Sequence, residues 1–186
     1  MGRNSLFQLR YELDAMHVSI EKSSPADIAS IFELYNAAAN FQRSKKTVVV
    51  WPEFEVALVK HEIAEGRQFK LCIGGELACV WAVAFSDPQI WKERDKDPSI
   101  YIHRIATASR FRGLRLVKQI VDWAKEYAKA NMKKFVRLDT LGENTRLINY
   151  YQEMGFTFLG MFTLNDTKGL PPHYHQAPAC LFEIKL

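Results

Sequence analysis

The chain has 186 residues, which is long enough for one domain with a sizeable core and short for two. Hydrophobic residues make up 48% of it and charged residues 25%, the balance of an ordinary globular protein. No apolar run approaches the roughly 20 residues that span a bilayer, and a net charge of +4 permits an anionic ligand without indicating nucleic acid.

The pattern of the N-terminal half predicts a strand, two helices and a hairpin. Residues 17–21 alternate as a strand, and Ser24 followed by Pro25 is typical of a helix start. Pro52 predicts the start of a second helix that ends near Gly66. Two strands, over residues 69–73 and 77–85, are then joined by a glycine turn at 74–75.

The C-terminal half alternates strands with helices. Residues 86–98 are polar, contain two prolines and indicate a loop, after which residues 100–107 predict a strand. Apolar residues recur at helical spacing from Leu114 onward. A strand, a helix and two strands follow, over residues 135–140, 143–154, 156–164 and 180–186, with a loop before the last strand. The order β-α-α-β-β-β-α-β-α-β-β indicates an α/β (α+β) protein with one mixed sheet and helices on its faces.

The N-terminus and the cysteines indicate organisation and compartment. Residues 1–15 lack the apolar core of a secretory signal, so we expect an N-terminal extension there and one domain over residues 16–186. Cys72, Cys79 and Cys180 match no zinc spacing and lie in strand-like apolar runs. Buried free thiols suit a reducing compartment, so we expect a cytoplasmic protein.

The most informative segment is NTRLINYYQEMGF, which runs from Asn144 to Phe156. Leu147 lies three positions after the asparagine, Tyr151 lies seven after it, and Gly155 precedes the closing phenylalanine. With the element order, this pattern resembles the GNAT family of N-acetyltransferases over nearly the whole chain. The resemblance implies a mixed, mostly antiparallel seven-stranded sheet with helices on both faces. It also implies acetyl-CoA as co-substrate and no metal, and it allows a homodimer.

In that family the CoA pyrophosphate binds a loop of the form Arg/Gln-x-x-Gly-x-Gly/Ala before a helix, where unpaired N–H groups favour anions. A register that starts at Arg110 puts Gly113 and Arg115 on the two small positions. A register that starts at Arg112 puts Arg115 and Val117 there and matches the following apolar helix better. In both registers a bulky residue replaces a small one that would let the backbone approach the phosphates closely.

The resemblance assigns this loop to the cofactor, although a solvated basic helix start is the alternative interpretation. The arginines would supply charge-assisted phosphate contacts. The expected cofactor-binding residues of the loop are Arg110, Arg112, Gly113, Leu114, Arg115, Leu116 and Val117.

Two residues are candidates for proton transfer. The family register makes Tyr151 the general acid that protonates the departing CoA thiolate, while Tyr150 beside it is interpreted as a packing aromatic. No glutamate precedes the loop where many relatives carry a base, and His103 stands on that strand, with an ordinary pKa near 6.5. Asp139, an ordered water, and a purely structural role for the histidine are the alternatives.

Backbone and amide groups complete the expected cofactor site. The N–H groups of Ile105, Ala106 and Thr107 would polarise the acetyl carbonyl, as in an oxyanion hole. Asn144 would bind the pantetheine arm of CoA, or serve only as the N-cap of its own helix.

The acceptor side is less defined by the sequence. Residues 171–175 contain a His-x-His pair without an evident third ligand, so a metal site is not expected. In relatives this loop often borders the acceptor pocket, and with Trp51, Phe54 and Trp91 it predicts an aromatic wall.

The leading interpretation is direct transfer of acetyl from acetyl-CoA to a primary amine of a small molecule or a protein. The rival is a non-catalytic binding or interaction module that keeps the GNAT fold with a degenerate phosphate loop. No stacking aromatics interleave the basic residues, so nucleic acid is not expected as a partner, and neither is a membrane. Acceptor pockets are built from variable loops, so the sequence does not name the amine.

Overall fold

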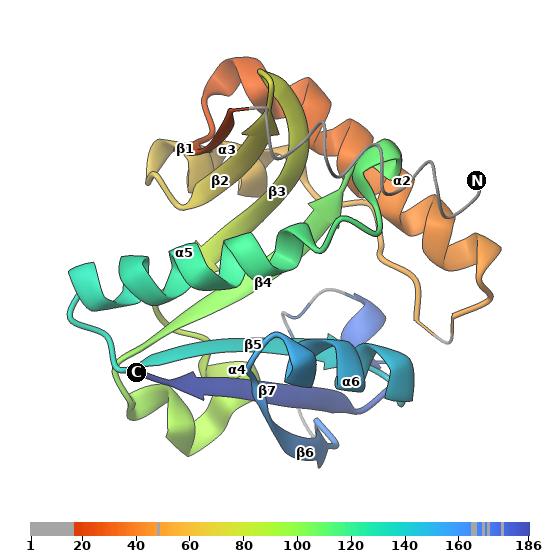
Figure 1. The fold of residues 1–186 in the computed structure, drawn as a ribbon. Coiled ribbons are helices and arrows are strands. Elements are labelled where there is room, and N and C mark those ends of the chain that lie inside the picture. Colours follow the sequence, from red (N-terminus) through yellow and green to blue (C-terminus); the bar gives the residue numbers. More distant parts are fainter. Residues whose placement is uncertain (1–16, 48, 165–166, 169, 171, 176) are drawn as a thin grey trace.

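The computed structural model describes residues 17–47, 49–164, 167–168, 170, 172–175 and 177–186, so the expected extension over residues 1–15 lies outside it. The described residues form a seven-stranded sheet in the order β1-β2-β3-β4-β5-β7-β6 (Figure 1). Only β4 and β5 pair in parallel, which confirms the predicted mixed, mostly antiparallel sheet. The strands are β1 (Val18–Lys22), β2 (Gln68–Ile73), β3 (Glu76–Ala84), β4 (Ser99–Thr107), β5 (Phe135–Leu141), β6 (Thr157–Phe162) and β7 (Ala179–Lys185).

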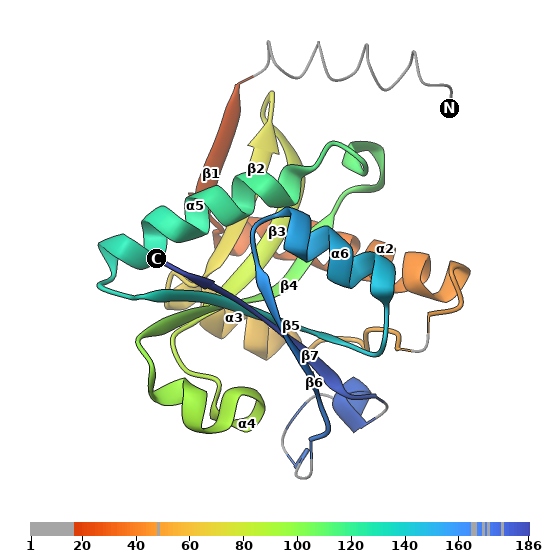
Figure 2. The ribbon, with the colours of Figure 1, turned by 60° about the horizontal axis from the view of Figure 1, so that its bottom comes forward.

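Helices cover both faces of this sheet. The two amphipathic helices α5 and α6 pack on one face, in front of the strands in Figure 2, and α2 and α3 pack on the other. No helix in the described part of the chain is long and apolar enough to cross a membrane. The helices are α2 (Ile28–Ser44), α3 (Val56–Ala64), α4 (Pro88–Trp91), α5 (Leu116–Ala130) and α6 (Thr145–Glu153), with short 3-10 turns η1 (Pro25–Asp27), η2 (Lys92–Lys96), η3 (Ser109–Phe111) and η4 (Pro172–His175).

Two expected elements differ from the structure. Helix α3 begins at Val56 and not at Pro52, because the preceding segment is held beside α2, where the Trp51 N–H donates to Gln42 Oε1 at 2.7 Å. The expected loop over residues 86–98 contains α4 and η2. Within this mostly polar segment, Ile90 and Trp91 are buried in a core cluster that they share with residues of the sheet.

Strands β4 and β5 pair over three residues and then separate, as Figure 1 shows. The last pair joins Tyr101 to Arg137. Further along β4 a bulge sets two residues, Arg104 and Ile105, opposite Trp81 of β3. Arg104 has φ +54°, in the left-handed region. Because a bulge bends its strand and increases its twist, it accounts for the opening between β4 and β5.

Candidate functional site

A cavity of about 470 Å³ lies beside the opened strands. Residues of α2, Trp51, the bulged end of β4, the loop before α5 and Tyr150 of α6 line it. Of the expected cofactor residues, the structure brings residues 105–107, 112–113 and 115–117 to its wall. These segments are distant in sequence, and the tertiary fold brings them together around one cavity.

The bulge determines what β4 presents to this cavity. Regular pairing with β3 resumes only at Ala106 and Thr107, so the bulge takes backbone groups just before them out of the ladder. An N–H group that is not used in a ladder must find another acceptor, and a bound carbonyl can supply one. The geometry is therefore compatible with the expected polarisation of an acetyl oxygen by Ile105 and its neighbours.

The loop before α5 has a glycine-like backbone conformation at two positions, only one of which is a glycine. Gly113 has φ +90°, and Arg115, the N-cap of α5, has φ +57°. The bulky residues at the two small positions do not fill the loop, since Val117 packs into the core and the half-exposed Arg115 reaches Glu153 at 3.4 Å. The first N–H groups of α5 have no partner within the helix, as in any helix start, and they border the cavity.

The three arginines of this region point to three different elements. Arg110 pairs with Glu76 and lies 4.5 Å over the ring of Phe111, which lines the cavity, but Arg110 itself is not among the lining residues. Arg112 donates to the Ala37 carbonyl at 3.2 Å, next to α2. Arg115 contacts α6 instead, so a shared anion site would require these arginines to leave their present partners.

Two further expected cofactor residues have structural contacts instead of cavity contacts. Leu114 packs against the core formed by α5 and the sheet. The Asn144 side chain accepts the Leu147 N–H at 3.1 Å and so caps α6, as the alternative interpretation expected.

The neighbouring tyrosines of α6 differ in environment. Tyr150 lines the cavity, whereas the Tyr151 ring packs against Phe182 with centroids 5.2 Å apart. Burial raises the pKa of Tyr151 well above its ordinary value, and the nearby Tyr150 and Asp139 raise it further. Tyr151 therefore remains protonated at neutral pH, as a proton donor must.

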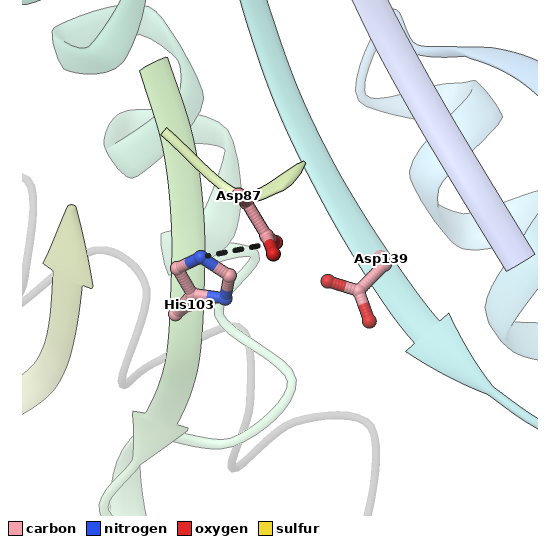
Figure 3. Close-up of side chains that lie close together, drawn as sticks. All are labelled: Asp87, His103 and Asp139. Atoms are coloured by element: carbon pink, nitrogen blue, oxygen red, sulfur yellow. Dashed lines mark ion pairs between the residues drawn. The ribbon is translucent and has the colours of Figure 1, made fainter. Parts of the chain in front are cut away.

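His103 lies in a cluster with two aspartates, shown in Figure 3. Its Nε2 is 3.6 Å from Asp87 Oδ2, and ligand atoms of His103, Asp87 and Asp139 all lie within 4.8 Å of one another. Tyr174 of η4 donates a hydrogen bond to Asp139 at 2.8 Å. Asp87 was missed in the sequence, where its only signal was a position just before Pro88 at the start of an unrecognised helix.

Burial sets the protonation of this cluster. It lowers the pKa of His103 to about 3, with help from the positive charges of Arg104 and Arg67. It raises the pKa of Asp87 to about 7 and that of Asp139 to about 6. At neutral pH the histidine is thus a weak base, and Asp87 titrates in the range that suits a general base.

The expected aromatic wall forms in part. Trp51 and Phe54 pack edge-to-face with each other and with Tyr35 of α2, and His173 of η4 meets Phe54 at 6.4 Å between centroids. Trp91 does not belong to this wall. It is buried against Tyr101 in the core cluster near α4.

Comparison with known proteins agrees with this geometry. The acetyltransferase (GNAT) family model matches residues 28–156. An uncharacterized N-acetyltransferase of Bacillus subtilis (strain 168), YesJ, is 32% identical over 74 residues, and the match spans only 40% of this chain and 41% of that relative.

Solved structures show the same fold at low identity. A GNAT-family acetyltransferase from Listeria monocytogenes 4b F2365 has a TM-score of 0.74 at 22% identity, over 91% of this chain and 95% of that one. A putative acetyltransferase from Salmonella typhimurium with its cofactor acetyl-CoA has a TM-score of 0.63 at 14% identity, over 91% and 94%. With the family model covering more than half of its residues, this chain belongs to the GNAT family of acetyltransferases.

Proposed function

We propose that this protein is an acetyl-CoA-dependent N-acetyltransferase that transfers acetyl directly to a primary amine of a small molecule or a protein. The observation that carries the proposal is the cavity, which unites the bulged end of β4, the loop before α5 and α2 in one space. Direct transfer needs a thioester and an amine held together in such a space.

The CoA pyrophosphate would lie over residues 112–117. The unpaired N–H groups at the start of α5 and the positive end of its dipole favour an anion there. A Cβ added at Gly113 meets no atom within 4 Å, so there is room beside the loop for a phosphate. Arg115 is half-exposed and Arg112 is partly exposed, and charge-assisted contacts to phosphate would replace their present contacts with Glu153 and the Ala37 carbonyl.

In this proposal Tyr151 has the role of acid. Acetyl-CoA supplies an acetyl group activated as a thioester. The amine nitrogen forms the new bond to the carbonyl carbon, and the carbon–sulfur bond breaks with its electron pair going to sulfur. Tyr151 donates a proton to that sulfur and recovers one from the nitrogen, which leaves no net charge on the phenol.

The non-catalytic alternative has one specific observation in its favour, the arginine and valine at the two small positions of the phosphate loop. Their directions weaken it, because Val117 packs into the core and Arg115 extends along the surface. Similar structures with acetyl-CoA or CoA, such as the Salmonella protein and the NatC complex bound to Gag peptide and CoA, also support cofactor binding here.

Calorimetry with acetyl-CoA, followed by a thiol-release assay on a panel of primary amines, tests the proposal. We expect micromolar binding and amine-dependent release of CoA. Absence of binding at millimolar acetyl-CoA would establish the scaffold alternative.

A further inference from the structure

His103 and Asp139 occupy equivalent places on the two parallel strands. Each lies two residues beyond the last pair, Tyr101 with Arg137, so the two side chains project to the same face of the sheet, one on either side of the opening. Asp87 reaches them from the segment that precedes α4 (Figure 3). The opening between β4 and β5 therefore carries two carboxyl groups and an imidazole at its closed end.

The aspartates lack a permanent cation. Among the described residues, neither Asp87 nor Asp139 forms an ion pair with a lysine or an arginine, and Asp87 Oδ2 is buried without a hydrogen-bond partner. Nearby, His173 is only 7% exposed, and its Nδ1 also has no partner in the described structure. Buried polar groups are normally paired, so these atoms have hydrogen-bonding capacity left for a water molecule or a ligand.

The cluster is largely buried but not completely enclosed. The side chains of Asp87 and His103 keep 12% and 21% of their surface accessible. Tyr174 holds Asp139 in place by its hydrogen bond of 2.8 Å, so the carboxyl group of Asp139 is ordered before a ligand arrives. A carboxylate has about four acceptor sites, so the bond from Tyr174 leaves Asp139 with further acceptor capacity.

The spacing of these groups suits an ammonium ion, although such a set of ligand atoms could also hold a metal ion. His103 Nε2 and Asp87 Oδ2 are 3.6 Å apart, and no pair of ligand atoms in the cluster is separated by more than 4.8 Å. Hydrogen bonds of about 2.9 Å from one nitrogen reach oxygens up to about 5.8 Å apart. The ligand atoms of the cluster are therefore close enough for one nitrogen to form hydrogen bonds with more than one of them.

We propose that Asp87 and Asp139 bind the ammonium group of the acceptor amine and that Asp87 takes its proton. This inference rests on the proposed acetyltransferase function. One N–H bond of the ammonium breaks, one O–H bond forms on Asp87, and the nitrogen keeps the electron pair with which it attacks. The neutral His103 accepts or donates one hydrogen bond beside Asp87 and acts as a positioning residue.

The groups around Asp87 fit this role. Asp139 of β5 and Asp95 of η2 face it with negative charge, His103 of β4 is neutral, and burial holds its carboxyl pKa at about 7. Asp95 accepts the backbone N–H of Asp87 at 2.6 Å and so fixes its position. The acceptor is accordingly an aliphatic amine that arrives as a cation, with its carbon chain toward the wall of Trp51 and Phe54.

The first experiment uses n-propylammonium chloride as a probe, with n-propanol as its neutral control. Carboxyl signals of protein labelled with 13C at aspartate are followed during each titration, and the signals are assigned with Asp87→Asn and Asp139→Asn. We expect propylammonium to shift both signals with a Kd on the order of 1–10 mM, and propanol to shift neither. Equal shifts with both probes, or no shift at all, would contradict the proposal that Asp87 and Asp139 bind an ammonium group. So would Zn²⁺ or Mn²⁺ binding at micromolar levels that requires Asp87.

The second experiment measures kcat/KM for the best amine of the panel together with calorimetry of acetyl-CoA. Asp87→Asn should lower kcat/KM about 100-fold or more and remove its rise with pH near 7, while acetyl-CoA affinity stays within about twofold. Glu93→Gln, an exposed acid on η2, is the matched control and should behave as wild type. Wild-type kcat/KM in Asp87→Asn would contradict the base.

The two proposals fail differently. If the wild-type protein does not bind acetyl-CoA but propylammonium still shifts the aspartate signals, the proposed function is refuted. The proposal that Asp87 and Asp139 bind an ammonium group then remains.

Discussion

Both carboxylate oxygens of Glu62 lie 2.5 Å from the guanidinium of Arg104, inside the protein and next to the cavity. The pair joins α3 to the bulge of β4, where Arg104 adopts φ +54°. A left-handed residue that is not glycine costs free energy, and this buried ion pair holds it in place. We therefore expect the opening of the sheet, and with it the cavity, to depend on this contact with α3.

Replacing Glu62 tests this dependence. Glu62→Ala leaves Arg104 buried without its partner and should lower the free energy of unfolding by about 3–5 kcal/mol, measured by urea denaturation. Glu65→Ala, which removes an exposed partner of Arg67, is the matched control and should change stability little. If Glu62→Ala is as stable as the control, the pair does not maintain the bulge.

The acid is tested by comparing the two neighbouring tyrosines. Tyr151→Phe should lower kcat by about 10²–10⁴ with little change in acetyl-CoA affinity, because only the proton donor is lost. Tyr150→Phe removes a hydroxyl from the cavity wall and should have a much smaller effect on kcat. Equal losses of kcat in the two variants would indicate that Tyr150, which lines the cavity, serves as the acid alone or together with Tyr151.

Arg115 combines a charge with a strained backbone, and two substitutions separate these properties. Arg115→Ala removes the guanidinium only and should weaken acetyl-CoA binding about tenfold if the arginine contacts phosphate. Arg115→Gly should weaken it equally but raise the free energy of unfolding by about 1 kcal/mol, because glycine accepts φ +57° without strain.

Calorimetry of both Arg115 variants measures their acetyl-CoA affinity, and urea denaturation measures their free energy of unfolding. Lys129→Ala, at the far end of α5, controls for the loss of a positive charge. Tighter acetyl-CoA binding in Arg115→Gly would mean that the arginine obstructs the loop.

The pH dependence of stability tests the environment of Asp87. Its pKa is about 7 in the folded protein, against 3.8 for an aspartate exposed to water, so the folded state binds this proton more tightly. The resulting stabilisation is complete below pH 4 and is lost as the pH rises through 7. The free energy of unfolding of the wild type should thus fall relative to Asp87→Asn by about 2–4 kcal/mol between pH 4 and pH 8.

Urea denaturation of both proteins at several pH values measures that difference. His103, whose pKa is lowered, contributes a dependence of opposite sign between pH 3 and 6.5, and taking the difference between the two proteins reduces its contribution. Asp122→Asn, on the exposed face of α5, should show no such trend. A difference that is constant with pH would mean that Asp87 is not held in a desolvated site.

Local patterns sufficed for most of the fold. Periodicity located the strands and long helices within a few residues, and the segment from Asn144 to Phe156 pointed to the family that the comparisons then showed. The helix near Pro52 and the loop over residues 86–98 were misplaced, because a hydrogen bond from Trp51 to α2 and the burial of Trp91 are not visible in a local pattern.

The sequence by itself determined the element order, the amphipathic faces and the place of the phosphate loop, because these follow from spacing along the chain. Only the tertiary structure decided that β4 bulges at Arg104 and separates from β5, and that Asp87 meets His103 and Asp139 at that opening. It also decided that Arg115 takes a glycine-like φ and that burial makes the histidine a poor base. Strand register, burial and the pKa values that depend on them arise from contacts between distant segments, and no single segment contains that information.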